Sequence, residues 1–150
     1  MDLQKPGSMG GTYAGNAVAC AAGVAVAKAF QEERILENVN ARGAELKSML
    51  EAAKRESQGK ILDVRGLGLM LALECTPGAG YASKIQAKCL QKDLLVLTTS
   101  IYDTLRFIPP LNITKDDMAK GCQIIKEAIE EVIAAGENPP ETPTKGQALE

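Results

Sequence analysis

The chain has 150 residues, a length typical of one domain, and a formal net charge of −2. This small charge gives no electrostatic reason to expect a nucleic acid or an anionic membrane as a partner. The sequence contains no histidine, which excludes Ser-His-Asp and Cys-His catalysis and removes the commonest metal ligand. We therefore expect no metal site, and any chemistry must come from a cofactor or from Lys, Arg and carboxylate side chains.

Four cysteines lie at irregular spacings with no C-x-x-C pair. This pattern favours reduced cysteines in an intracellular protein over a disulfide framework. The longest apolar run without a charge covers residues 17–27, which is too short to span a bilayer and lacks the basic flank of a signal peptide. We expect a cytoplasmic chain, with the mitochondrial matrix open as the compartment of a longer parent protein.

The first informative segment is a glycine-rich stretch, GGTYAGN, at residues 10–16. Gly10 and Gly11 give backbone freedom, Thr12 gives a hydroxyl, and a helix that begins at Asn16 directs free N–H groups back toward the segment. These are the parts of an anion site, most naturally for a phosphate. The strand that normally frames such a loop is absent from the preceding residues, so we expect the chain to be the later part of a larger enzyme.

A helix is predicted over residues 16–31, with Asn16 as a favourable N-cap. Its segment AVACAAGVAVA, at residues 17–27, is apolar on every side, and helices of this kind are buried all round. A chain of this length has few elements to surround such a helix. We therefore predict that part of its packing surface comes from another subunit or from polypeptide outside this chain.

A second helix is predicted over residues 33–56, because apolar side chains recur there at helical spacing. The stripe consists of Ile35, Leu36, Val39, Leu46, Met49, Leu50 and Ala53. Two short strands follow at residues 61–64 and 69–74, joined by a bend at residues 65–68, whose glycines suit a tight turn or a bulge. A Pro-Gly turn at residues 77–78 precedes a short helix over residues 82–92.

Two further strands are predicted at residues 94–97 and 105–108, with a loop at residues 98–104 between them. Pro109 and Pro110 prevent the second strand from continuing. Thr114 and Asp117 form a capping signature for a last helix, and its stripe contains Met118, Ile125, Ile129, Val132 and Ile133. Residues 136–150, with three prolines and no apolar periodicity, are predicted to be a disordered tail.

The predicted order of elements is helix-helix-β-β-helix-β-β-helix. This order favours an α+β fold in which helices cover one face of a small, mainly antiparallel sheet, preceded by a long alanine-rich helix. We divide the chain into a glycine-rich loop at residues 1–15, a folded region at residues 16–135 and the tail at residues 136–150.

Three motifs together give the sequence a family resemblance. GGTYAGN at residues 10–16, VRGLGLM at residues 64–70 and LRFIPPL at residues 105–111 follow one another in order, with Thr114 and Asp117 behind them. The chain resembles the C-terminal part of the class III pyridoxal-phosphate aminotransferases, a group that includes 4-aminobutyrate and ornithine aminotransferases. The order, the spacing and the flanking elements agree from about residue 8 to residue 132. The resemblance implies the C-terminal small domain of a fold-type I aminotransferase, with residues 1–15 left from the large domain.

The resemblance also implies roles for single residues. The threonine of the first motif hydrogen-bonds the phosphate of pyridoxal 5′-phosphate across a homodimer interface, which assigns cofactor binding to Thr12 and the adjacent Gly11. The arginine of the third motif binds the substrate carboxylate in many members, which assigns substrate binding to Arg106. The implied substrates are an amino acid or amine, such as the ω-amino acid 4-aminobutyrate, and a 2-oxo acid. A planar guanidinium suits a carboxylate because the two can form a bidentate, charge-assisted pair.

The residues by themselves leave other interpretations open. Thr12 could serve only as a local cap, and Arg106 could be a surface arginine in an ion pair. We interpret Arg65 as part of a structural bend and assign it no ligand. Tyr102 could line the substrate side of the loop before Arg106, or could be an ordinary tyrosine at a strand edge.

The motif that carries the family's Schiff-base lysine is not present in this sequence, and none of the twelve lysines replaces it, because a solvated lysine keeps its proton at neutral pH. We therefore expect no catalytic residue here, no covalent cofactor and no transaminase activity from the chain alone. Three possibilities stay open for this polypeptide. It could be a truncated product without its own function, an interaction domain that associates with a complete aminotransferase subunit, or a small regulatory domain that binds a carboxylate through Arg106.

Overall fold

The computed structural model describes residues 10–135. Their elements follow the predicted order, with two helices, a strand pair, a helix, a second strand pair and a last helix. The described residues divide between Leu36 and Glu37 into two units. The tail predicted at residues 136–150 lies outside the described residues, as do residues 1–9 of the predicted glycine-rich loop.

The first unit contains helix α1 (Ala17–Glu32), close to the predicted bounds. The Asn16 Oδ1 atom accepts a hydrogen bond from the Ala19 N–H at 2.9 Å, which confirms Asn16 as the N-cap. None of the residues of α1 is buried within this chain. The expected packing of this apolar helix against a surface outside the chain stays a prediction.

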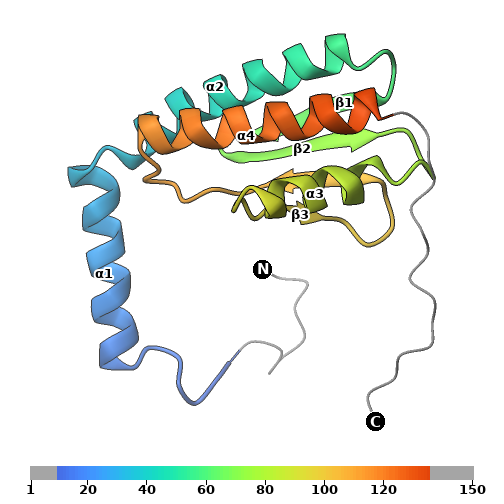
Figure 1. The fold of residues 1–150 in the computed structure, drawn as a ribbon. Helices are drawn as coiled ribbons and strands as arrows, with labels where there is room; N and C mark the ends of the chain where they lie inside the picture. The colour runs from blue at the N-terminus through green and yellow to red at the C-terminus, as the bar shows by residue number, and fades with distance from the viewer. Residues whose placement is uncertain (1–9, 136–150) are drawn as a thin grey trace. The chain divides into compact units, whose positions relative to one another are not determined.

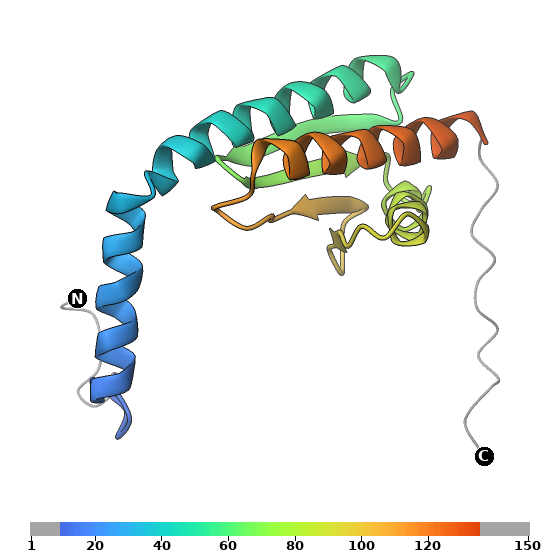
Figure 2. The same cartoon turned by 60° about the vertical axis from the view of Figure 1, so that its left-hand side comes forward.

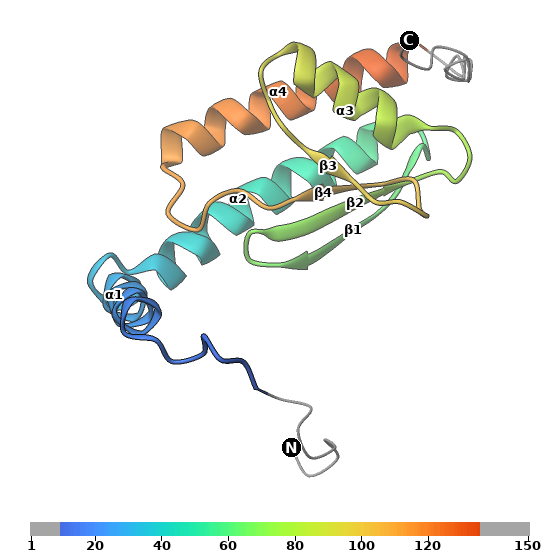
Figure 3. The same cartoon turned by 90° about the horizontal axis from the view of Figure 1, so that it is seen from below.

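A four-stranded sheet forms the centre of the second unit. Its strands are β1 (Ile61–Leu67), β2 (Met70–Cys75), β3 (Leu97–Thr98) and β4 (Thr104–Phe107), in the order β1-β2-β4-β3. All three neighbouring pairs are antiparallel. Figure 3 shows this order from the side opposite helix α2. The predicted antiparallel sheet is therefore confirmed.

The bend predicted at residues 65–68 is wrong in its extent, because β1 continues to Leu67. Arg65 lies opposite Ala72 in the ladder, and Gly66 lies opposite Leu71. Gly66 has a φ of +130°, and a Cβ at this position would collide with the main chain of β2. Because glycine has no Cβ, β1 can continue through residue 66 and stay paired with β2. The turn between the two strands consists only of residues 68–69.

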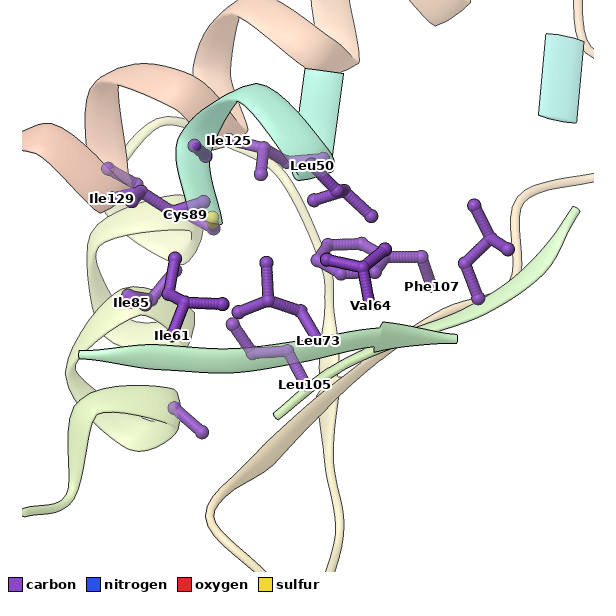
Figure 4. Packing of buried hydrophobic residues seen from close by; sticks show 14 of the residues in the cluster. Leu50, Ile61, Val64, Leu73, Ile85, Cys89, Leu105, Phe107, Ile125 and Ile129 are labelled. Carbon is purple, nitrogen blue, oxygen red and sulfur yellow. The ribbon is translucent and has the colours of Figure 1, made fainter. Parts of the chain in front are cut away.

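Helices α2 (Ile35–Glu56) and α4 (Lys115–Ala134) lie side by side over one face of the sheet, as Figures 1 and 2 show. Helix α3 (Tyr81–Gln91) packs against α4 and the strands. The three helices and the sheet bury one hydrophobic core between them (Figure 4). Its fully buried side chains include Leu50, Leu73, Ile85, Leu105 and Ile129.

The apolar stripes of α2 and α4 largely face this core, because residues three and four apart share one side of a helix. Leu36 is an exception, since 64% of its surface is exposed, and its place in the predicted stripe is wrong. The strand predicted at residues 94–97 is also largely wrong. Only Leu97 and Thr98 form β3, while Leu94 and Val96 contribute to the core without strand pairing.

In the second unit two helix N-termini are capped by side chains, and only one of these two caps was predicted from the sequence. Thr114 caps α4 as predicted, since its Oγ1 accepts from the Asp117 N–H at 3.1 Å. The residue that precedes α3 is Gly80, which has no side chain to cap the helix. The carboxylate of Asp103 replaces it, accepting from the Tyr81 N–H at 3.1 Å and from the Ala82 N–H at 2.7 Å.

Candidate functional site

The glycine-rich segment forms a turn directly before α1. The Ala14 N–H donates to the Gly11 carbonyl at 3.0 Å, and the side-chain amide of Asn16 donates to the Tyr13 carbonyl at 2.8 Å. Gly15 has a φ of +73°, a conformation that favours glycine. These contacts shape the turn that leads into the helix, whose first N–H groups have no partner within the helix itself; that of Ala19 is bonded to Asn16.

Gly11 and Thr12 are both exposed in this turn. A hydroxyl and main-chain N–H groups beside a helix N-terminus are suitable donors for a phosphate. Phosphate binding by Gly11 and Thr12 therefore stays a prediction that agrees with the local geometry. Gly11 and Thr12 belong to the first unit, and Arg106 belongs to the second.

Arg106 lies in β4, directly opposite Ala72 of β2 and Leu97 of β3. Its neighbours Leu105 and Phe107 are buried in the core, whereas Arg106 is exposed. Because side chains alternate along a strand, the guanidinium is directed to the face opposite the core. Within residues 10–135 this side chain has no hydrogen-bond or ion-pair partner. The alternative of a surface arginine in an ion pair is therefore not what the structure shows for Arg106.

The backbone that carries Arg106 is held on both sides. It pairs with β2 and with β3, and β4 ends at Phe107, shortly before Pro109 and Pro110. A groove of about 280 Å³ lies beside this strand end, between β3, β4 and α4, and its lining is mainly apolar. The result is a cationic group on a firmly paired strand, which is suited to orienting a small carboxylate, whereas the apolar groove lies on the side of the sheet that α4 covers.

Arg65 differs from Arg106 in its partners. One of its terminal nitrogens, Nη1, contacts the carboxylates of Glu74 and Asp63, the latter at 3.1 Å. Hydrogen bonding to Glu74 and then to Asp63 raises the pKa of the Arg65 guanidinium. The interpretation of Arg65 as a structural residue agrees with these contacts. The acidic partners were not identified from the sequence, since Glu74 is nine residues away along the chain and becomes a neighbour only through the β1–β2 register.

Tyr102 lies in the loop before β4 and is 67% exposed. Its carbonyl accepts from the Thr104 N–H and from the Thr99 hydroxyl, each at 2.8 Å. The tyrosine is therefore an exposed loop residue whose main chain shapes the tight turn between β3 and β4. Asp103, for which the sequence predicted no role, connects the same loop to two other elements. Its carboxylate binds the start of α3, and its carbonyl accepts a hydrogen bond from the Cys75 N–H of β2 at 2.8 Å.

Among residues 10–135, the lysines are accessible to solvent or paired with other groups. Within the described part of the chain, no lysine is buried. Several have structural partners instead. Lys60 donates to the Ile133 carbonyl at the end of α4, and Lys92 contacts Glu127 and Glu131 of the same helix. A nucleophilic lysine requires a desolvated amine, and these side chains remain solvated or paired.

Residues 10–135 contain no cluster of acidic or thiol side chains that could hold a metal ion. Within the same residues, no helix is both long and apolar enough to cross a membrane. The cysteines in this part of the chain are free thiols, and burial raises the pKa of Cys75 to about 12 and that of Cys89 to about 11. Both therefore act as small core residues, and neither is an activated nucleophile.

Known proteins share sequence similarity with this chain over most of its length. The sequence profile described as "Aminotransferase class-III" matches residues 1–129. The chain is 41% identical to the 5-aminovalerate aminotransferase DavT of Pseudomonas aeruginosa, over 88% of this chain and 33% of that protein. It is 38% identical to the 4-aminobutyrate aminotransferase GabT of Escherichia coli, over 87% of this chain and 32% of that protein.

Solved structures give the same result for the fold. The ornithine aminotransferase of Toxoplasma gondii superposes with a TM-score of 0.79 at 28% identity, over 91% of this chain and 32% of that chain. The acetylornithine aminotransferase of Elizabethkingia anophelis gives 0.74 at 32% identity, over 87% and 34%. The chain spans about a third of the length of the curated relatives it matches. It belongs to the class III aminotransferase family.

Proposed function

We propose that this chain provides the carboxylate-binding part of a pyridoxal-phosphate aminotransferase, which transfers an amino group from an ω-amino acid such as 4-aminobutyrate to a 2-oxo acid. The observation that carries the proposal is the state of Arg106, an exposed guanidinium without a partner among the described residues, fixed on a doubly paired strand. Amino-acid and 2-oxo-acid substrates share a carboxylate. A single fixed arginine can therefore orient both in turn.

Of the groups of pyridoxal phosphate, only the phosphate has suitable partners among the described residues of this chain. Gly11 and Thr12 offer a hydroxyl and main-chain N–H groups beside the N-terminus of α1, which suit the phosphate. When bound, pyridoxal phosphate supplies the electron sink that allows an amino group to leave one carbon skeleton and join another. The tether for the cofactor's ring is a separate requirement, and the solvated lysines of residues 10–135 do not meet it. We therefore propose that this chain alone has no transaminase activity.

We also propose that the active unit contains additional polypeptide, either in a homodimer or in association with a complete aminotransferase subunit. The length of the family relatives, about three times that of this chain, supports this proposal. The specific observation in favour of such an association is α1, which has no buried residue and exposes apolar side chains such as Val18, Val24 and Val26. An interaction domain without its own catalysis is the second candidate function, and it uses the same surface.

The role of Arg106 is tested by NMR on the chain labelled with 15N-arginine, titrated with glutarate, a dicarboxylate with no reactive group. We expect the chemical shift of the Arg106 Nε–Hε signal to change with glutarate concentration until it reaches a plateau. This change should be absent in Arg106→Met. The matched control is Arg55→Met, which removes an exposed arginine of α2 with the same change in charge. If glutarate moves no arginine signal, or if Arg55→Met has the same effect as Arg106→Met, the carboxylate-binding function is refuted.

A further inference from the structure

Two arginines occupy matching positions on either side of one alanine. Arg65 of β1 lies opposite Ala72 of β2, and Ala72 lies opposite Arg106 of β4. Directly opposed residues of antiparallel strands project from the same face of the sheet. The two guanidiniums therefore emerge from the face opposite the core, two strands apart, and the small side chain of Ala72 leaves the space between them open.

One carboxylate is placed within reach of both arginines. Glu74 lies two residues beyond Ala72 on β2, so it is a diagonal neighbour of Arg65 on one side and of Arg106 on the other. Long side chains in diagonal positions can contact each other across a strand pair. In the structure Glu74 pairs with Arg65, and Arg106 has no partner among the described residues. Asp63 adds a second carboxylate to Arg65 at 3.1 Å.

The β4 side offers Glu74 a second partner besides Arg106. Thr104 lies directly opposite Glu74 in the β2–β4 ladder and is 2% exposed. Its hydroxyl has no hydrogen-bond partner within residues 10–135. A buried hydroxyl without a partner carries a desolvation cost, which a carboxylate turned toward it would relieve. If the Glu74 carboxylate lay between Thr104 and Arg106 instead, it could therefore accept hydrogen bonds from the Thr104 hydroxyl and from the Arg106 guanidinium.

We propose that Arg65 is a positioning residue that holds Glu74 on the β1 side of the sheet and thereby keeps Arg106 free to bind a substrate carboxylate. The inference rests on the proposed carboxylate binding by Arg106. Without Arg65, Glu74 turns toward β4, pairs with Arg106 and competes with the substrate. A surface pair between neighbouring strands is modest in strength, so we expect the affinity of Arg106 for a dicarboxylate to fall by about twofold to sixfold.

The test extends the glutarate titration of the 15N-arginine-labelled chain to three variants. Arg65→Met should shift the Arg106 Nε–Hε signal in the free chain and weaken glutarate binding by the stated factor. The double variant Arg65→Met/Glu74→Gln has the same net charge as the wild type and removes the competitor, so it should restore both. Glu74→Gln alone should move the signal of Arg65 and leave that of Arg106 in place, which also tests the proposal should Arg65→Met fail to fold.

The outcomes separate the two proposals. If the wild-type chain shows no glutarate-dependent movement of the Arg106 signal, carboxylate binding itself is refuted. If the wild type binds and Arg65→Met binds equally well, the positioning role is refuted while the binding function stands. If affinity falls in Arg65→Met and the double variant does not recover it, the loss comes from another effect of the substitution, and the role assigned to Glu74 is wrong. Arg55→Met measures the effect of losing one positive charge elsewhere on the chain.

Discussion

Replacing Asp103 by alanine should destabilise the chain by about 2 kcal/mol, although this aspartate lies in a loop. Its carboxylate accepts from the Tyr81 and Ala82 N–H groups, at 3.1 and 2.7 Å, and so caps α3 from a distance of more than twenty residues along the chain. Loss of a capping side chain costs about 0.5–2 kcal/mol. The upper part of this range applies because the acceptor is charged and faces the positive end of a helix dipole.

The surroundings of the cap support this magnitude. Tyr81 and Ala82 are each 2% exposed, so water cannot easily replace the lost acceptor at their N–H groups. Gly80, which precedes the helix, has no side chain that could take over the cap. Asp103→Asn keeps one acceptor oxygen and loses the charge, so its effect should be about half as large.

The assay is urea unfolding of the whole chain, followed by circular dichroism. With an m-value of about 1.5 kcal/mol/M, a loss of about 2 kcal/mol lowers the midpoint by about 1.3 M. The control is Asp116→Ala, which removes an exposed aspartate from the first turn of α4 and should change the stability by no more than about 0.5 kcal/mol. Equal midpoints for Asp103→Ala and Asp116→Ala would show that the interaction between loop and helix does not stabilise the fold.

Two further predictions concern the hairpin and the thiols. Gly66→Ala should destabilise the chain by about 3 kcal/mol, because the residue has a φ of +130° and its Cβ would collide with the main chain of β2. Gly121→Ala, in a helix position with open space around the new methyl group, should instead leave the stability unchanged or raise it by up to about 1 kcal/mol. The melting temperatures of the two variants in thermal unfolding test this difference. In the native chain at pH 8, a thiol reagent should label the exposed Cys20 and spare the buried Cys75 and Cys89. The raised pKa of these two thiols leaves at most about one part in a thousand of each as thiolate. Labelling is detected by mass spectrometry of peptides, and rapid labelling of the two buried thiols would contradict the described core.

Local sequence signals predicted most of the elements and their order. The helices α2 and α4 were identified because apolar residues recur at helical spacing, and the caps Asn16 and Thr114 were identified because their side chains act within three residues. The short strand β3 was not predicted correctly, since two residues carry no periodicity. Leu36 was placed in the apolar stripe because its spacing fits helical periodicity, yet it is 64% exposed, whereas the adjacent Ile35 is buried.

The sequence by itself determined the family and singled out Arg106, because the motifs that carry both are continuous segments of the chain. Only the tertiary structure decided which charged groups meet. The strand register brings Glu74 between Arg65 and Arg106, and the β3–β4 loop brings Asp103 to the end of α3. Hydrogen bonds and ion pairs require contact within a few ångströms, and such contacts between residues far apart along the chain exist only once strands and helices have packed together.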